Sequence, residues 1–257
     1  MKYICDVKTR DELAIFLDIP LKILTHQLYI NHPNSCYTSF EIKKKSGGIR
    51  QIHAPKDGLK NIQRKIANAL WNYEKALRIN KGIKSNISHA FEKSKSIFTN
   101  AKIHRNKKIV LNIDLKDFFH SIHFGRVQGF FMKNKDYNMP YEVAVIIAQL
   151  CCYKGKLPQG APTSPIISNL ICKILDIRLL KLAHEYKLDY TRYADDLTFS
   201  TNCKTFLNQQ NDFLEKITKE IESAGFFIIV NGNENCRLLF ADPHGVRVAN
   251  GCARQFK

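Results

Sequence analysis

The side chains in this sequence that are best suited to chemistry are the carboxylates of three aspartates. Asp195 and Asp196 are adjacent, and they lie between two short runs rich in Tyr, Thr and Phe within Asp189–Ser200. Such runs are typical of strands, so they predict a hairpin with the acid pair at its turn. Two like charges held together repel each other unless a cation offsets them, and carboxylate oxygens suit Mg²⁺. Because Asp-Asp is also common in solvated turns, the pair alone leaves both interpretations open.

A third carboxylate, Asp114, lies near the end of an apolar, β-branched run that begins at Lys108 and predicts a buried strand. An acid that follows a core strand is often a helix cap, and Asp117 suits that role. If the two predicted strands are neighbours in one sheet, Asp114 comes close to Asp195 and Asp196. Three carboxylates at one sheet edge could hold two metal ions ~3.5–4 Å apart, as in enzymes that displace a phosphate leaving group in line.

A third element lies between these two, over Lys156–Asn169. Its prolines and Gly160 predict a turn, and Ser164-Pro165 opens an apolar helical run, with Pro165 well suited to a first helical position. Gln159 offers both a hydrogen-bond donor and an acceptor beside the flexible glycine. A plain loop followed by a helix cap is the alternative interpretation.

Together these elements resemble the reverse transcriptases. The strand that ends near Asp114 is similar to the family's first catalytic motif, Leu157–Gly160 with the following Ser-Pro to its dNTP-site motif, and Tyr193–Asp196 to its second catalytic motif. Their order and spacing are also those of the family. The resemblance covers roughly residues 35 to 231.

Two further segments narrow the resemblance. Asn100-Ala-Lys-Ile-His104 is similar to the Asn-Ala-x-x-His element of retron reverse transcriptases, bacterial enzymes that copy a structured non-coding RNA into a branched DNA. Arg50, with Ile52 and Pro55, resembles the family's fingers segment. A group II intron, diversity-generating or abortive-infection type is a second enzyme class to consider. A non-catalytic RNA-binding scaffold that lacks a thumb is the alternative from outside the enzymes.

The resemblance implies an α+β fold with right-hand polymerase fingers and a ferredoxin-like palm, the thumb being absent or truncated. We expect residues 1–108 to form mainly N-terminal helices and basic fingers. Residues 109–257 would form the palm, with helices of the fingers and palm over 125–188. The pattern of apolar residues predicts a hairpin over 35–55, helices near 11–17 (with Asp11 as a possible cap), 59–77, 94–104, 143–152 and 205–224, and strands over 226–230, 237–240 and 246–249.

The resemblance also implies roles for single residues. Asp114, Asp195 and Asp196 would be catalytic and would hold two Mg²⁺ ions, with Asp196 mattering somewhat less than the others. The incoming dNTP would be bound by Arg50, Phe119, Gln159 and Gly160, where Phe119 excludes the ribose 2′-hydroxyl. Nucleic acid would be contacted by Tyr193, Asn100 and His104. For Tyr193 an ordinary strand aromatic is an equal alternative, and for His104 a helix cap is the alternative.

The formal net charge of +17 predicts an anionic partner. Residues 1–110 hold 22 Lys and Arg against 8 Asp and Glu, and this basic half precedes the acidic site. Nucleic acid is therefore favoured over solubility as the reason for the charge. The expected partners are a structured non-coding RNA template, its DNA product and dNTPs, with an effector or toxin protein as a further candidate and a role in anti-phage defence.

The eight cysteines form no Cys-x-x-Cys pair, and no secretory segment or run of ~18–20 apolar residues is visible, so we expect a cytoplasmic protein without a membrane segment. The tail departs from the family. Where the family has a lysine after Asn231, this chain has Glu234, and it ends at Lys257, before a thumb. A truncated form, a disrupted tail and a natural short form remain open, and each bears on processive synthesis.

Overall fold

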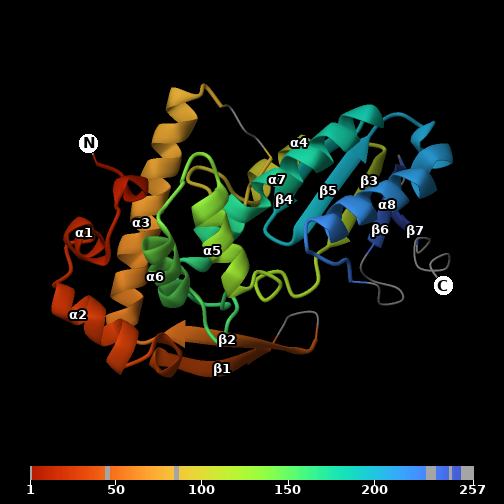
Figure 1. Cartoon of the computed structure of the whole chain (residues 1–257). Helices are drawn as coiled ribbons and strands as arrows, with labels where there is room; N and C mark the ends of the chain where they lie inside the picture. The colour runs from red at the N-terminus through yellow and green to blue at the C-terminus, as the bar shows by residue number, and fades with distance from the viewer. Residues whose placement is uncertain (1, 44–46, 84–86, 230–235, 243–244, 250–257) are drawn as a thin grey trace. The chain divides into compact units, whose positions relative to one another are not determined.

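The computed structural model describes residues 2–43, 47–83, 87–229, 236–242 and 245–249, and it divides into two compact units (Figure 1). The first unit comprises residues 1–84 and 119–171, and the second comprises residues 85–118 and 172–257. This division differs from the predicted boundary at residue 108. Each unit is assembled from segments that are distant in sequence, so a single boundary along the chain does not describe them.

The described part of the first unit is mainly helical, with a two-stranded antiparallel sheet of β1 (Tyr37–Lys43) and β2 (Ile49–Pro55). Tyr37 pairs with Pro55 and Lys43 with Ile49, which confirms the predicted hairpin. The unit's other elements are η1 (Ile4–Asp6), α1 (Arg10–Phe16), α2 (Leu21–Thr25), η2 (His26–Ile30), η3 (Pro33–Cys36), α3 (Asp57–Asn80), α5 (Phe124–Lys133), α6 (Tyr141–Cys151) and the beginning of α7 (Ser164–Glu185).

The long helix α3 carries the core of the first unit. Its apolar stripe is buried, with Leu59, Ile66 and Leu70 almost inaccessible to solvent. Gln63 interrupts this stripe, and its amide nitrogen donates to the Tyr37 hydroxyl and to the Leu150 carbonyl, each at 2.7 Å. The buried amide therefore ties α3 to both β1 and α6, since a buried polar group that lacks partners would be costly.

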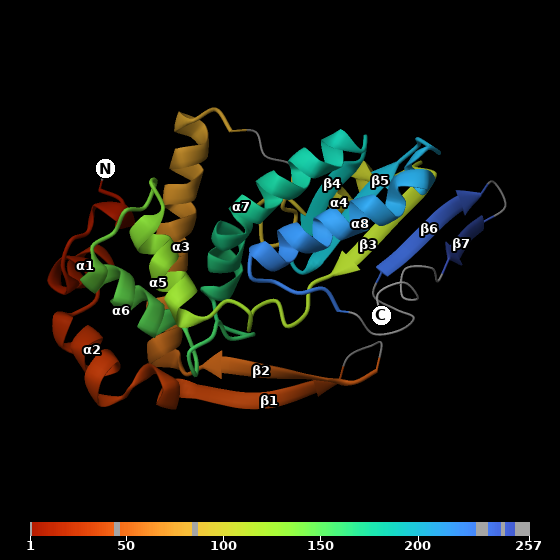
Figure 2. The ribbon, with the colours of Figure 1, turned by 45° about the vertical axis from the view of Figure 1, so that its right-hand side comes forward.

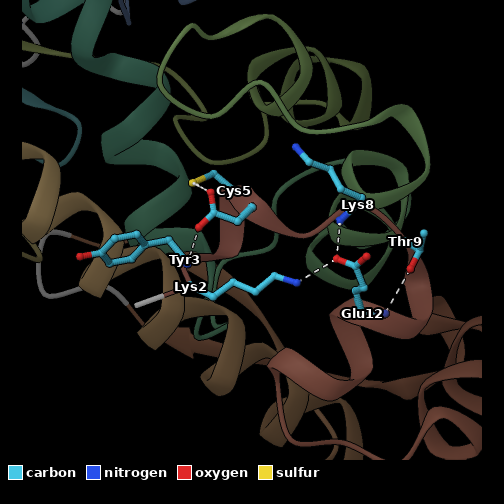
Figure 3. A network of polar contacts seen from close by, with 7 residues as sticks. Lys2, Tyr3, Cys5, Lys8, Thr9 and Glu12 are labelled. Atoms are coloured by element: carbon cyan, nitrogen blue, oxygen red, sulfur yellow. Dashed lines mark hydrogen bonds and ion pairs between the residues drawn. The ribbon is translucent and has the colours of Figure 1, made fainter.

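The N-terminal segment is fixed by a polar network around Glu12 (Figure 3). The Glu12 carboxylate accepts from Lys2 Nζ at 3.0 Å and from the Lys8 backbone at 3.2 Å, and these bonds lower the pKa of Glu12. Thr9 Oγ1 accepts from the Glu12 backbone N–H and caps α1. The predicted cap, Asp11, is wrong, because it already lies inside the first turn of this helix.

In the described residues, no single helix is long and apolar enough to cross a membrane. Within the same described ranges, α1 and the helical segment Leu21–Ile30 together are long and apolar enough, but they are bent by 118° relative to each other.

The second unit is built on a five-stranded antiparallel sheet. Its strands are β3 (Ile109–Asp114), β4 (Asp189–Tyr193), β5 (Asp196–Thr201), β6 (Cys236–Asp242) and β7 (Gly245–Ala249), in the spatial order β4-β5-β3-β6-β7. Within this unit, whose sequence is interrupted by residues 119–171 of the first unit, β3, α7, β4, β5, α8 (Phe206–Ser223) and β6 occur in a β-α-β-β-α-β order. The described residues of this unit also include helix α4 (Ile97–Ile103).

The two faces of this sheet have different surroundings. Figures 1 and 2 show α8 and the C-terminal part of α7 side by side over one face. Phe199 of β5 stacks on Tyr190 of β4 and meets Phe213 of α8 edge-on, with ring centroids 4.7 and 5.2 Å apart. Because side chains alternate along a strand, the residues between these core positions point to the opposite face.

One predicted strand is wrong. Of the predicted strand over 226–230, the described residues 226–229 form no ladder and make one isolated bridge, between Ile228 and Leu115. Phe226 is fully buried and stacks on Phe118, so tertiary packing explains its apolar character. The predicted departures at Asn231 and Glu234 lie outside the described residues.

Candidate active site

The acid pair lies at the tip of the β4–β5 hairpin, as predicted. Tyr193 pairs with Asp196, and Ala194 and Asp195 form the two-residue turn between them. Ala194 has φ +57°, a conformation that glycine usually supplies at this position of a hairpin turn and that costs a residue with a side chain about 1–3 kcal/mol. The surrounding contacts must therefore hold this turn in place.

The third aspartate lies directly beside the hairpin. β3 pairs with β5 so that Asp114 is opposite Asp196, and the backbone N–H of Leu115 donates to the Asp195 carbonyl at 3.1 Å. Leu111 and Ile113 face the buried side of the sheet, so by alternation Asp114 points to the other face. The expectation that the two strands are neighbours is confirmed.

The same alternation places Tyr193 on the face of the acids. Tyr193 points to the same face of the sheet as Thr191, two residues earlier. Tyr190 and Arg192 point to the opposite face, which α7 and α8 cover. Tyr193 is half-buried and directly opposite Asp196. A strand aromatic at this position is available to a ligand that lies against the carboxylates.

The carboxylates influence one another electrostatically. Asp196 is exposed as a residue, yet its carboxyl group is partly removed from water. This desolvation, together with the negative charge of Asp195, raises the pKa of Asp196 to about 6. A cation beside the pair would lower the cost of ionising both groups.

The chemistry of the three aspartates fits Mg²⁺, because carboxylate oxygens are the hard donors that this ion takes from proteins. In the conformation described, however, the part of the chain with defined placement contains no group of three or more His, Cys, Asp or Glu side chains gathered closely enough to hold a metal ion. The backbone positions of Asp114, Asp195 and Asp196 are thus adjacent, while their side chains are not arranged as one set of ligands.

The structure places His104 at the end of α4, where it is the C-cap residue, and buries it against the sheet. One ring nitrogen bonds the Ser200 hydroxyl at 2.7 Å and the other the Thr191 hydroxyl at 2.6 Å. Burial lowers the pKa of His104 to about 4. Both nitrogens have protein partners, so this placement favours the helix-end alternative and does not fit the predicted direct contact with RNA.

Asn100, on the same helix, is also buried, with 9% of its surface exposed. Its side-chain oxygen has no hydrogen-bond partner among the described residues. A direct contact between Asn100 and RNA would need this side chain to become accessible. The motif from Asn100 to His104 therefore packs α4 against β4 and β5.

In the first unit, the loop that contains Gln159 and Gly160 packs directly on strand β2. The Gln159 carbonyl accepts from the His53 N–H at 2.8 Å. Gly160 has φ +120°, and a Cβ atom there would lie 2.8 Å from Ile52 Cγ2 and 3.0 Å from the His53 carbonyl oxygen. Glycine is needed here both for the backbone conformation and for the close approach.

Two other predicted dNTP contacts also belong to this unit. Arg50 lies on β2, three residues before His53, and its side chain is exposed. The structure thus brings Arg50 and the Gln159–Gly160 loop to the same strand. Phe119 is half-buried, whereas the preceding Phe118 is buried against Phe226, as expected for a core residue.

Sequence reasoning missed a buried ion pair behind the hairpin. Arg192 is fully inaccessible and binds Asp176 of α7 through two bonds of 2.8 Å. The available signal was a lone arginine inside an apolar strand, two positions before the turn, and a lone aspartate inside an apolar helix.

Comparison with known proteins agrees with the motifs. The family model "Reverse transcriptase (RNA-dependent DNA polymerase)" matches residues 42–229. The chain is 35% identical to retron Mx65 reverse transcriptase of Myxococcus xanthus over 83% of this chain and 52% of that protein. It is also 35% identical to retron Ec86 reverse transcriptase of Escherichia coli, over 90% of this chain and 67% of that protein.

A third relative, retron Ec73 reverse transcriptase of Escherichia coli, is 35% identical over 71% of this chain and 58% of its own length. The chain therefore spans about half to two thirds of the length of these curated relatives. The region matched by the family model contains Asp114, Asp195 and Asp196. On the motifs, the hairpin geometry and these matches, the chain belongs to the reverse transcriptase family and is of the retron type.

Proposed function

We propose that this chain is an RNA-directed DNA polymerase that copies a structured non-coding RNA into DNA. The observation that carries the proposal is the register of the sheet, in which Asp114 lies opposite Asp196 while Asp195 occupies the adjoining turn. Two carboxylate residues of neighbouring strands and a third in the turn thereby occupy adjacent backbone positions, which supports the roles that the sequence motifs imply.

The reaction would be attack of a primer 3′-hydroxyl oxygen on the α-phosphorus of a dNTP. The new O–P bond forms, the bond to the β-phosphate oxygen breaks, pyrophosphate leaves, and the hydroxyl proton is lost to water. Asp114, Asp195 and Asp196 would hold two Mg²⁺ ions. When bound, such ions lower the pKa of an attacking hydroxyl and neutralise charge on leaving phosphates. The protein's own contribution is mainly positioning.

The residues of the first unit would bind the incoming nucleotide. The exposed guanidinium of Arg50 offers a planar fork of donors suited to a triphosphate. The loop of Gln159 and Gly160 is fixed on the same strand and would contact the nucleotide through the Gln159 side chain. Phe119, five residues after Asp114, would exclude a ribose 2′-hydroxyl by steric contact.

Tyr193 would pack on the primer terminus, and its place on the face of the acids supports this assignment. Asn100 and His104 would influence RNA binding indirectly, by fixing α4 on the sheet. The β-α-β-β-α-β order of the second unit supports its assignment as a ferredoxin-like palm. The helices and hairpin of the first unit would supply the fingers.

The names of the relatives and the net charge of +17 support a retron non-coding RNA as template and the DNA copy as product. We further propose that the protein acts in the cytoplasm, that it has an effector protein as a partner, and that it serves in anti-phage defence.

Primer extension on an RNA template with labelled dNTPs and Mg²⁺ tests the proposal. The wild type is compared with the double variant Asp195→Asn, Asp196→Asn. A matched control, Asp212→Asn with Glu215→Gln, removes two carboxylates from exposed positions of α8 in the same unit. We expect extension by the wild type and the control, and a loss of at least about 100-fold in the double variant.

RNA binding is measured in parallel, because it distinguishes an active polymerase from a scaffold that binds RNA without extending a primer. Extension that persists in the double variant would contradict the assignment of the aspartates. A wild type that binds RNA but never extends a primer would instead support the RNA-binding scaffold.

A further inference from the structure

The guanidinium of Arg192 makes hydrogen bonds to both Asp176 and the Ala194 carbonyl in a fully buried position. Nε and Nη2 donate to the two carboxylate oxygens of Asp176, each at 2.8 Å, and Nη1 donates to the Ala194 carbonyl oxygen at 3.1 Å. The Tyr190 hydroxyl donates to Asp176 Oδ1 at 3.0 Å. Asp176 is itself 5% exposed. The fork of the arginine thus connects helix α7 to the hairpin turn.

The ion pair is not explained well by stability alone. Moving an arginine and an aspartate out of water is unfavourable, and apolar side chains of similar volume usually stabilise a core as well or better. The feature that apolar side chains cannot reproduce is the third bond, because only a donor can hold the Ala194 carbonyl. A guanidinium whose other two donors are fixed in a planar pair has little freedom to move that third donor.

The bond acts on the residue of the turn that most needs support. Ala194 has φ +57°, and its peptide leads directly into Asp195. The next carbonyl, that of Asp195, accepts from the N–H of Leu115, which follows Asp114. Two successive carbonyls of the turn are therefore held from two directions, one by Leu115, which follows β3, and one by Arg192, which is fixed to α7.

The backbone of Arg192 is fixed as well. Its N–H donates to the Ile87 carbonyl at 2.8 Å, and its own carbonyl accepts from the His89 N–H at 2.8 Å. These bonds attach the outer edge of β4 to residues 87–89. Neither end of the arginine can shift without breaking several hydrogen bonds.

We propose that Arg192 and Asp176 are positioning residues for the polymerase reaction, which set the orientation of Asp195 and Asp196 by holding the Ala194 carbonyl. The inference rests on the proposed function. Arg192 and Asp176 would raise the affinity of the aspartates for divalent metal and the turnover number, and they would affect dNTP binding less.

The test replaces the whole buried group by apolar residues. The variant Tyr190→Phe, Arg192→Met, Asp176→Leu removes the charges together and leaves no tyrosine hydroxyl without its acceptor. The control Arg178→Gln, Glu220→Gln removes an Arg–carboxylate pair between α7 and α8 that does not touch the turn. Three quantities are measured: the midpoint of thermal unfolding, Mn²⁺ affinity by titration calorimetry without nucleic acid, and the kcat and KM for dNTP in primer extension.

We expect the apolar variant to unfold close to the wild-type temperature. Its Mn²⁺ affinity and kcat should fall about 10- to 100-fold, as for other residues that orient metal ligands, while KM for dNTP changes much less. The control should match the wild type in all three. A folded apolar variant with wild-type Mn²⁺ affinity and wild-type kcat would overturn the proposal.

Two further variants keep the test decisive. Asp176→Asn preserves the volume and one acceptor but loses the paired anion, so it should weaken Mn²⁺ affinity even if the apolar variant fails to fold. Arg192→Lys keeps the charge without the fork and should not restore wild-type affinity. If the wild type binds Mn²⁺ but does not extend primers, the proposed function fails, while the Mn²⁺ measurements still decide whether the pair orients the aspartates.

Discussion

Asp114 and Asp196 occupy directly opposite positions of the antiparallel pair β3–β5. These strands are distant in sequence, and their register alone brings the two carboxylates to the same end and the same face of the sheet. Asp195 enters from the turn between β4 and β5 and so has a different backbone environment from Asp196. The three acids are therefore not equivalent, and their substitution should not have equal effects.

Asp195→Asn is expected to reduce nucleotide addition at least about 100-fold, and Asp114→Asn similarly, because each removes a charge that would hold a metal ion. Asp196→Asn should cost less. Single-turnover primer extension with saturating dNTP measures the difference. RNA affinity should stay nearly unchanged, since carboxylates do not attract phosphates. An Asp196→Asn variant that is more impaired than Asp195→Asn would reverse the assigned order.

Local patterns predicted the elements that carry the carboxylates. The sequence pattern over residues 35–55 indicated the first hairpin, and the runs on either side of Ala194-Asp195 indicated the second. The pairing of β3 with β5 was the condition under which the sequence predicted that the acids meet, and the structure supplies it. These features depend on residues that are close in sequence or on a known order of motifs.

Features that depend on long-range packing were not predictable in the same way. No pattern links a strand arginine to a helix aspartate, so the contact between Arg192 and Asp176 became visible only in the structure. Phe226 has the apolar character of a strand residue, but it is buried against Phe118 outside any ladder. Histidine is a residue type that can contact RNA, yet both ring nitrogens of His104 form hydrogen bonds with residues of β4 and β5.

Phe119→Ala should admit ribonucleotides. Phe119 is half-buried, so truncation would open space beside a nucleotide sugar without emptying the core position held by Phe118. The ratio of kcat/KM for dNTP over rNTP measures the change, and we expect it to fall by at least about tenfold, the size of a lost steric contact. Phe118→Leu is the control and should change stability rather than sugar selection. If Phe119→Ala discriminates between dNTP and rNTP as well as the wild type does, the role of Phe119 is purely structural.

Gly160→Ala should damage the loop that carries Gln159. The new Cβ atom would lie 2.8 Å from Ile52 Cγ2 and 3.0 Å from the His53 carbonyl oxygen, and φ +120° is unfavourable for alanine. We expect a loss of about 1–3 kcal/mol in the free energy of unfolding and a raised KM for dNTP.

Gly129→Ala is the matched control for that substitution. Gly129 lies within α5, and a Cβ atom there meets nothing within 4 Å. Alanine in this helix should raise the free energy of unfolding by about 0.5–1 kcal/mol. Equal effects of the two substitutions on stability and KM would show that the loop does not depend on its close contact with β2.

The burial of His104 makes the stability of the second unit depend on pH. Desolvation lowers the pKa of His104 to about 4; Asp189 opposes this shift, and His89 and Lys107 reinforce it. The unfolded imidazole takes up a proton near pH 6.5, so the group favours neither state at higher pH. As the pH falls from about 6.5 to 4, His104 binds a proton in the unfolded chain but stays neutral in the folded chain. The free energy of unfolding therefore decreases by up to about 3 kcal/mol.

His104→Gln keeps a donor and an acceptor for Ser200 and Thr191 but cannot be protonated. It should be less stable than the wild type at pH 7, because glutamine fits the two hydroxyls less well, and the difference should shrink or reverse by pH 4.5. Urea unfolding at a series of pH values measures it. His184→Gln, at an exposed position of α7 in the same unit, should leave the wild-type pH dependence in place. A constant difference between His104→Gln and the wild type across this range would mean that His104 is protonated equally in the folded and unfolded chain.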